Sequence, residues 1–69
     1  MSKYIITFFS HYEALMAKRE IKEGRLISVP RALSSSCGTA MEVLLDSINP
    51  NFKYEAIYIE EGKNYKKVY

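Results

Sequence analysis

The first 29 residues constrain the fold most, because a strand pattern, a helix pattern and another strand pattern follow one another with short links. The run Tyr4–Phe9 is rich in aromatic and β-branched residues, which predicts a buried strand. Ser10 then supplies a helix N-cap, and Glu13 completes the S-x-x-E capping box. Leu26–Val29 predicts the next strand. This order indicates a βαβ unit with a parallel strand pair and a right-handed crossover.

The helix between these strands is expected to run from about residue 11 to residue 23. Gly24 can adopt the left-handed conformation that ends many helices, so it marks the expected C-terminal end. Ala14, Ala17 and Ile21 recur at helical spacing, with Leu15 on their flank. This face is expected to pack into the core.

The stretch from residue 39 to residue 48 fits two templates. A helix would bring together four apolar residues at helical spacing, namely Met41, Leu44, Leu45 and Ile48. A strand would alternate over part of the same stretch, through Thr39, Met41, Val43 and Leu45. Periodicity does not decide between them, so both alternatives stay open. Asn49–Asn51 predicts a turn in either case.

The C-terminal residues predict a β-hairpin. Tyr54–Ile59 alternates as a strand does, Glu61–Asn64 offers turn residues, and Tyr65–Tyr69 forms the second arm. Lysines in that arm suit a solvent-facing edge. The 69 residues have room for one compact domain, expected to span residues 1–69. A content of 48% hydrophobic and 26% charged residues suits a folded protein.

Composition and charge exclude several classes of protein. The formal net charge of +2 is small and evenly spread, so no nucleic-acid partner is expected. With one cysteine and one histidine, we expect no intramolecular disulfide, no metal site and no cofactor. No run approaches the ~20 apolar residues that span a membrane. The first residues do not form a signal peptide, so we expect a reducing cytoplasmic location, where a lone thiol stays free.

The most distinctive chemical group is a thiol within a small-residue loop, Ser34-Ser35-Ser36-Cys37-Gly38. A positive φ at Gly38 would let the loop amides and serine hydroxyls converge into an anion-accepting concavity. Arg31 lies nearby in sequence and would add positive potential. The loop is therefore expected to favour the thiolate form of Cys37.

Several alternatives for Cys37 stay open. If the following segment is a helix, Ser35 or Ser36 is its N-cap and the helix dipole acts on Cys37. If that segment is a strand, only the loop amides and Arg31 act on Cys37. Cys37 could instead be a small buried apolar residue, as many free cysteines are. A nucleophilic dyad of Cys37 and His11 can also be drawn, but nothing in the sequence forces the two side chains together.

Four blocks of this sequence resemble the selenium/sulfur (Se/S) carrier protein-like family. The central block is Val29–Ala40, and its Ser-Ser-Cys-Gly portion is the most specific part. The opening strand Tyr4–Phe8, the helix start Ser10-His11 and the later Tyr54–Tyr58 are also similar to that family. Together the blocks cover most of the chain in the expected order.

The resemblance implies a compact α/β (α+β) fold, a ferredoxin-like sandwich of the βαββαβ type. Family members have a longer helical stretch between the cysteine block and the last strand. Here Leu44–Lys53 leaves room for about two helical turns. The expected arrangement is therefore βαββ(α)β, with a shortened second helix and a C-terminal β-hairpin.

The resemblance also implies a function for Cys37. The thiol would hold sulfur or selenium as a persulfide or its selenium analogue, taken from a donor protein and passed to an acceptor protein. The protein would then be a carrier without turnover of its own. The expected binding residues around Cys37 are Arg31, Ser34, Ser35, Ser36 and Gly38.

Two other functions remain as alternatives. In a non-catalytic interaction module, the edge strand with Lys63, Lys66 and Lys67 would dock on a partner protein, although a solvated strand edge would look the same. In a redox sensor, oxidation of Cys37 would be the functional event. A tyrosine-rich domain with an edge strand could also form a homodimer, but no sequence feature requires one.

Overall fold

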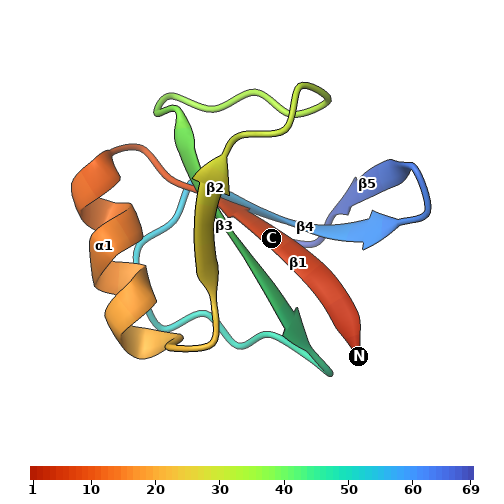
Figure 1. Ribbon diagram of the computed structural model, residues 1–69, viewed down its shortest axis with the longest axis horizontal. Coiled ribbons are helices and arrows are strands. Elements are labelled where there is room, and N and C mark those ends of the chain that lie inside the picture. Colours follow the sequence, from red (N-terminus) through yellow and green to blue (C-terminus); the bar gives the residue numbers. More distant parts are fainter.

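A computed structural model describes residues 1–69 and shows one helix packed against a five-stranded antiparallel sheet (Figure 1). The elements in chain order are β1 (Ser2–Thr7), α1 (His11–Glu20), β2 (Arg25–Ser28), β3 (Thr39–Leu45), β4 (Ala56–Glu61) and β5 (Asn64–Lys67). The strands lie in the order β2-β3-β1-β4-β5. The predicted α+β class and the C-terminal hairpin, formed by β4 and β5, are confirmed. No helix is long and apolar enough to cross a membrane.

The strand β1 occupies the centre of the sheet, antiparallel to β3 on one side and to β4 on the other. The predicted pairing of the first two strands is wrong, because β3 lies between β1 and β2. β1 and β2 run in the same direction but do not neighbour each other. The seven residues of β3 bury Ala40, Met41 and Val43, whereas β2 has four residues and none is buried. An inner position for β3 therefore removes more apolar surface from water.

The open choice for residues 39–48 resolves as a strand over Thr39–Leu45. Met41 and Val43 are buried, while the side chain of Leu44 is 56% exposed. Strand alternation requires this difference, whereas the helical template would have buried Leu44. The pairing of β3 with both neighbours also satisfies its backbone groups.

The predicted shortened second helix is wrong, since residues 46–55 contain no helix. Pro50 has no N–H to donate and disfavours helical conformation at the residue before it, and so short a segment gains little from helix formation. The segment instead buries Ile48 and packs Phe52 and Tyr54 against the core. Irregular chain therefore contributes to the core where a ferredoxin-like fold has its second helix.

The helix α1 begins where the sequence predicts. Ser10 is the N-cap, and its Oγ accepts the N–H of Glu13 at 3.3 Å. Glu13 Oε1 in turn accepts the N–H of Phe9 at 3.0 Å, so both sides of the capping box are satisfied. The helix ends at Glu20 rather than at residue 23.

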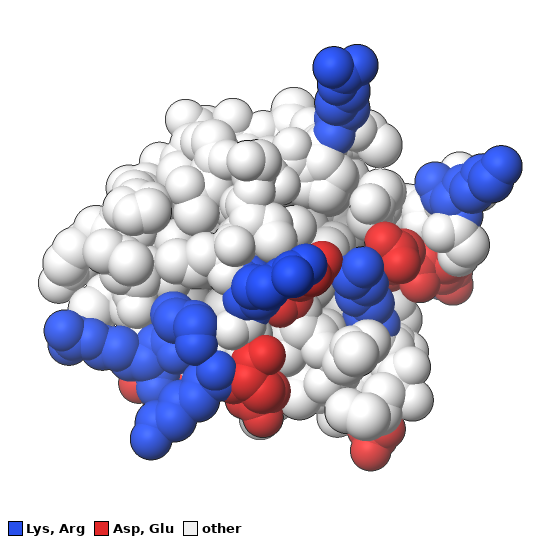
Figure 2. Space-filling view, in the orientation of Figure 1, with Lys and Arg blue, Asp and Glu red and all other residues white.

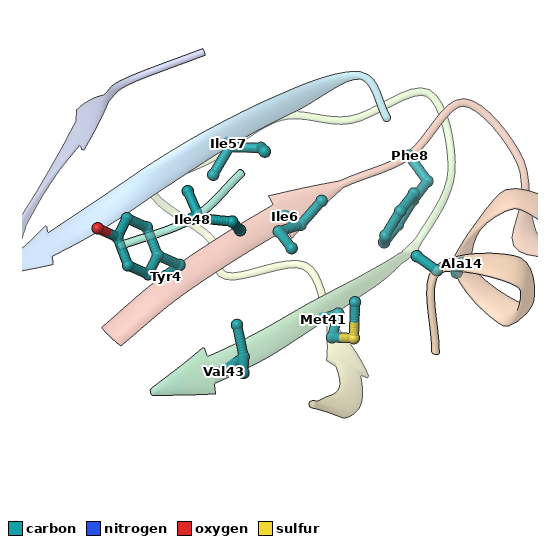
Figure 3. Close-up of a cluster of buried hydrophobic side chains, with 9 residues drawn as sticks. Tyr4, Ile6, Phe8, Ala14, Met41, Val43, Ile48 and Ile57 are labelled. Carbon is teal, nitrogen blue, oxygen red and sulfur yellow. The ribbon is translucent and has the colours of Figure 1, made fainter. Parts of the chain in front are cut away.

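The core lies between α1 and one face of the sheet. Figure 3 shows buried side chains of β1, β3 and β4 spread along this face, with Phe8 and the helix residue Ala14 toward one end and Tyr4 toward the other. The buried cluster consists of Tyr4, Ile6, Phe8, Ala14, Ala17, Met41, Val43, Ile48 and Ile57. Of the predicted helix face, Ala14 and Ala17 are confirmed as core and Ile21 packs at its edge. Leu15 is 46% exposed.

The other face of the sheet carries a group of ion pairs. Lys3 Nζ lies 3.3 Å from Glu42 Oε2 and 3.9 Å from Glu60 Oε2, and Arg25 also pairs with Glu42. Burial raises the pKa of Glu42, but hydrogen bonds from Arg25 and Lys3, with their positive charges, outweigh it and hold the pKa below its usual range. The pairs connect β2, β3, β1 and β4 across the sheet.

Gly24 does not adopt the left-handed conformation predicted for the end of the helix, so that part of the prediction is wrong. It instead lets the backbone after α1 pass close to Met41 of β3. The only positive φ in the chain belongs to Gly62, at 61° in the β4–β5 turn. A Cβ on Gly24 would lie 2.9 Å from Met41 Cγ and 3.2 Å from the Ile21 carbonyl oxygen. Because Met41 is fully buried in a packed core, it has little room to move away.

Replacing Gly24 by alanine should therefore destabilise the fold by about 1–3 kcal/mol, since the added methyl group must displace Met41. Gly38→Ala is the matched control. No heavy atom lies within 4 Å of the Cβ position of Gly38 and its φ is not positive, so its free energy of unfolding should change by less than about 0.5 kcal/mol. Urea unfolding measures both variants. Equal stabilities would contradict the packing role of Gly24.

Candidate functional site

Cys37 lies near the end of the connection between β2 and β3, residues 29–38, which we call the Cys loop. The Val29 N–H bonds to the Gly38 carbonyl at 3.2 Å and closes the base of this loop. Within the loop, the Leu33 N–H bonds to the Pro30 carbonyl at 3.0 Å and forms a turn. The side chain of Cys37 is partly exposed, so it is neither a core residue nor fully solvated.

The sulfur of Cys37 sits against the first residue of β3. The backbone N–H of Thr39 donates to Cys37 Sγ at 3.3 Å, and the thiol lies 3.8 Å from the Thr39 carbonyl oxygen as a weak donor. A backbone N–H directed at sulfur stabilises negative charge on it. Because Cys37 precedes a strand, the helix dipole considered for the helical alternative does not act on this residue.

Glu55, the residue before β4, holds the serines of the Cys loop. Ser35 Oγ lies 2.8 Å from Glu55 Oε1 and 3.1 Å from the Phe8 carbonyl oxygen, two acceptors that share its single hydrogen. Ser36 donates its N–H to Glu55 Oε1 at 3.2 Å and its hydroxyl to Oε2 at 2.9 Å. Ser35 Oγ also accepts the Cys37 N–H at 3.3 Å. These contacts fix the loop beside Cys37 to the sheet.

The serine donors therefore face a carboxylate of the chain itself and do not form the expected concavity around the sulfur. Gly38 does not have the positive φ that such a concavity was expected to use. Of the remaining predicted binding residues, Ser34 and Arg31 are exposed and neither forms a hydrogen bond or an ion pair with another side chain. The structure thus brings Ser35, Ser36 and Cys37 together and leaves Ser34 and Arg31 in solvent.

Sequence reasoning missed Glu55. The residue belongs to a block interpreted only as a strand, and no local pattern connects it to serines 19 and 20 positions earlier. The one available signal is a carboxylate directly before the apolar strand residues Ala56 and Ile57. The Glu55 N–H also donates to the Thr7 carbonyl oxygen at 2.7 Å. This bond holds the backbone of Glu55 against the end of β1.

His11 also lies beside the Cys loop. Its Nδ1 is 3.1 Å from Thr39 Oγ1, so the imidazole contacts the same residue whose N–H reaches the sulfur. No hydrogen bond joins the imidazole to the thiol itself. The direct Cys37–His11 dyad is therefore not formed, although the two residues share Thr39 as a neighbour.

The lysines of the interaction-module alternative lie away from this arrangement. Lys63 belongs to the turn between β4 and β5, and Lys66 and Lys67 belong to β5, one of the two edge strands. All three residues are exposed and none forms an ion pair. This pattern is that of a solvated strand edge.

The fold and the Cys loop define a small α+β protein whose single cysteine lies two residues before an inner strand of the sheet. A model of the family described as Putative Se/S carrier protein-like matches residues 3–69. Since the match covers nearly the whole chain, the protein belongs to this family, and the resemblance noted in the sequence is confirmed. Comparisons with curated proteins and with solved structures give no match.

The contacts of Glu55 predict a pH dependence of stability. A hydrogen bond from the Ser35 side chain lowers the pKa of Glu55, and burial opposes it. Further hydrogen bonds from Ser36 and Thr7 also lower the pKa, so it lies below the usual range. Because the pKa of Glu55 is lower in the folded state than in the unfolded state, its charge stabilises the fold at pH values above the ordinary Glu pKa of about 4.3. This contribution is lost as the pH falls through the pKa of Glu55 in the folded state.

Glu55→Gln should therefore be less stable than the wild type by about 1 kcal/mol at pH 7. Because a protonated Glu55 resembles glutamine in charge, the difference should shrink at pH 3.5. Glu42 is unchanged in both proteins, so its own titration cancels in the comparison. Glu61→Gln, at an exposed position whose side chain forms no hydrogen bond or ion pair, should match the wild type at both pH values. Urea unfolding measures all three, and a pH-independent difference for Glu55→Gln would contradict the role of its charge.

Proposed function

We propose that the protein carries a sulfur or selenium atom on Cys37, received from a donor and passed to an acceptor protein. Membership of the Se/S carrier-like family over residues 3–69 is the observation that carries this proposal. The partly exposed thiol supports it, because a carrier atom must meet two different partners in turn. A reducing compartment such as the cytoplasm would keep the thiol free for loading.

The transfer needs no group beyond the donor and the thiol. The Cys37 thiolate attacks the outer sulfur of a donor persulfide, a new S–S bond forms on Cys37, and the S–S bond of the donor persulfide breaks. The donor sulfur leaves as a thiolate, so one sulfur atom changes place and no net oxidation occurs. A selenium atom at the outer position transfers in the same way.

Three features of the chain suit a persulfide on Cys37. The Thr39 N–H that donates to Sγ stabilises negative charge on the attacking sulfur. The bonds of Ser35 and Ser36 to Glu55 hold the loop in one conformation, so a partner meets a defined surface. The chain has no second cysteine that could displace the carried atom as an intramolecular disulfide.

The proposal predicts that Cys37→Ser cannot be loaded. Wild-type protein incubated with a low-molecular-weight persulfide should gain the mass of one sulfur atom, and a thiol reductant should remove it. Cys37→Ser should gain nothing. Ser34→Ala, at an exposed loop position without side-chain contacts, should load as the wild type does. Intact-protein mass spectrometry before and after reduction provides the measurement.

The reductant distinguishes the carrier from a redox sensor, because a sulfinic acid adds nearly the same mass as one sulfur but resists reduction. A Cys37→Ser protein that still held removable sulfur would contradict the proposal. So would a wild-type protein whose only adduct is resistant to the reductant.

A further inference from the structure

The imidazole of His11 stands beside Cys37 but has no part in the site as described so far. His11 is the first residue of α1 and is exposed. Its Nδ1 lies 3.1 Å from Thr39 Oγ1, and the N–H of the same Thr39 lies 3.3 Å from Cys37 Sγ. One threonine therefore contacts both the imidazole, through its side chain, and the sulfur, through its backbone N–H, and no hydrogen bond engages the imidazole Nε2.

A shallow hollow of about 310 Å³ opens between His11 and the base of the Cys loop. Its lining residues are His11, Leu26, Ile27, Ser28, Gly38 and Thr39. Gly38, which follows Cys37 directly, has no heavy atom within 4 Å of its Cβ position, so this side of the loop is open. His11 is the only lining residue that can carry a charge.

The other charged groups near this hollow are held elsewhere. On α1, Glu13 bonds to the Phe9 N–H, and across the loop Glu55 bonds to the serines. Arg31 is the one basic residue of the Cys loop and extends into solvent. Figure 2 shows no Lys, Arg, Asp or Glu over the start of α1 in this view, while charged side chains gather over the lower and right parts. On the face shown, no charged side chain therefore lies over the start of α1, and the carboxylate of Glu13 in its first turn is bonded to the Phe9 N–H.

We propose that protonated His11 is the positive group of the Cys37 site and selects negatively charged sulfur or selenium donors for the hollow beside it. This inference rests on the carrier function proposed above. The transfer moves the negative charge from the Cys37 sulfur to the departing donor sulfur, so a negative charge is present at the site throughout the step. A cation at His11 attracts an anionic donor and offsets the charge that the donor leaves behind.

The charge of His11 gives this selection a distinctive pH dependence. Histidine is the side chain that ordinarily changes charge between pH 5 and 8, whereas an arginine stays positive throughout. An attraction that depends on a histidine charge therefore fades as the pH rises through this range. Attraction due to Arg31 stays constant.

Two alkylating reagents test the inference without any donor. Iodoacetate is an anion and iodoacetamide is neutral, and each forms one S–C bond with the Cys37 thiolate and releases iodide. Both reagents react with the same thiolate. The ratio of their two rates at one pH therefore does not depend on the fraction of Cys37 that is ionised. In the wild type, the iodoacetate-to-iodoacetamide ratio should be about threefold to tenfold higher at pH 6 than at pH 8. High salt should reduce this difference.

His11→Gln keeps a hydrogen-bond donor for Thr39 but removes the charge, so its ratio should be the same at both pH values. Arg31→Gln and Lys63→Gln are the matched controls, and both should retain the change between pH 6 and pH 8. A wild-type ratio that does not change with pH, or a change that persists in His11→Gln, would overturn the inference.

The two proposals can fail separately. If persulfide loads on Cys37 but the reagent ratio is independent of pH, the carrier function stands and the role of His11 is wrong. If the ratio depends on His11 but Cys37 holds no removable sulfur, the imidazole acts on the thiol but the selection of chalcogen donors is wrong.

Discussion

The pairing of Thr7, at the end of β1, determines how the rest of the structure comes together. Thr7 lies opposite Ala40 of β3 on one side and Ala56 of β4 on the other. The residue after it, Phe8, is buried, and its carbonyl oxygen lies 3.1 Å from Ser35 Oγ. Antiparallel pairing on both sides of one strand therefore brings together the Cys loop that precedes β3 and the carboxylate that precedes β4.

This arrangement explains why serines flank the cysteine. Three donors of Ser35 and Ser36 converge on the Glu55 carboxylate, and Ser35 also accepts the N–H of Cys37. Hydrogen bonds to a charged group are stronger than those between neutral groups, so they fix a loop that has few apolar contacts of its own. The serines thus give the cysteine a defined place, and the Thr39 N–H acts directly on its sulfur.

Local signals in the sequence predicted the elements that depend on neighbouring residues. The capping box of Ser10 and Glu13 and the hairpin around Gly62 are examples, because all of their determinants lie within a few positions. The place of β3 between β1 and β2 and the partnership of Glu55 with the serines depend on residues far apart in the chain. Periodicity carries no information about such pairings, so only Cys37 and its serines could be identified in advance.

The second helix was predicted from family resemblance and not from a helical pattern. The segment that replaces it fills the core with Ile48, Phe52 and Tyr54 from irregular chain. Hydrophobic burial requires apolar side chains at the right place but does not require a helix to deliver them. These side chains therefore cover part of the sheet face that a second helix would cover.

The most direct test of the carrier function is the mass of the protein isolated from the cells that make it, measured with and without a thiol reductant. We predict an added sulfur or selenium atom on the peptide that contains Cys37, removed by the reductant. A fully unmodified Cys37, or an adduct that the reductant does not remove, would contradict the account.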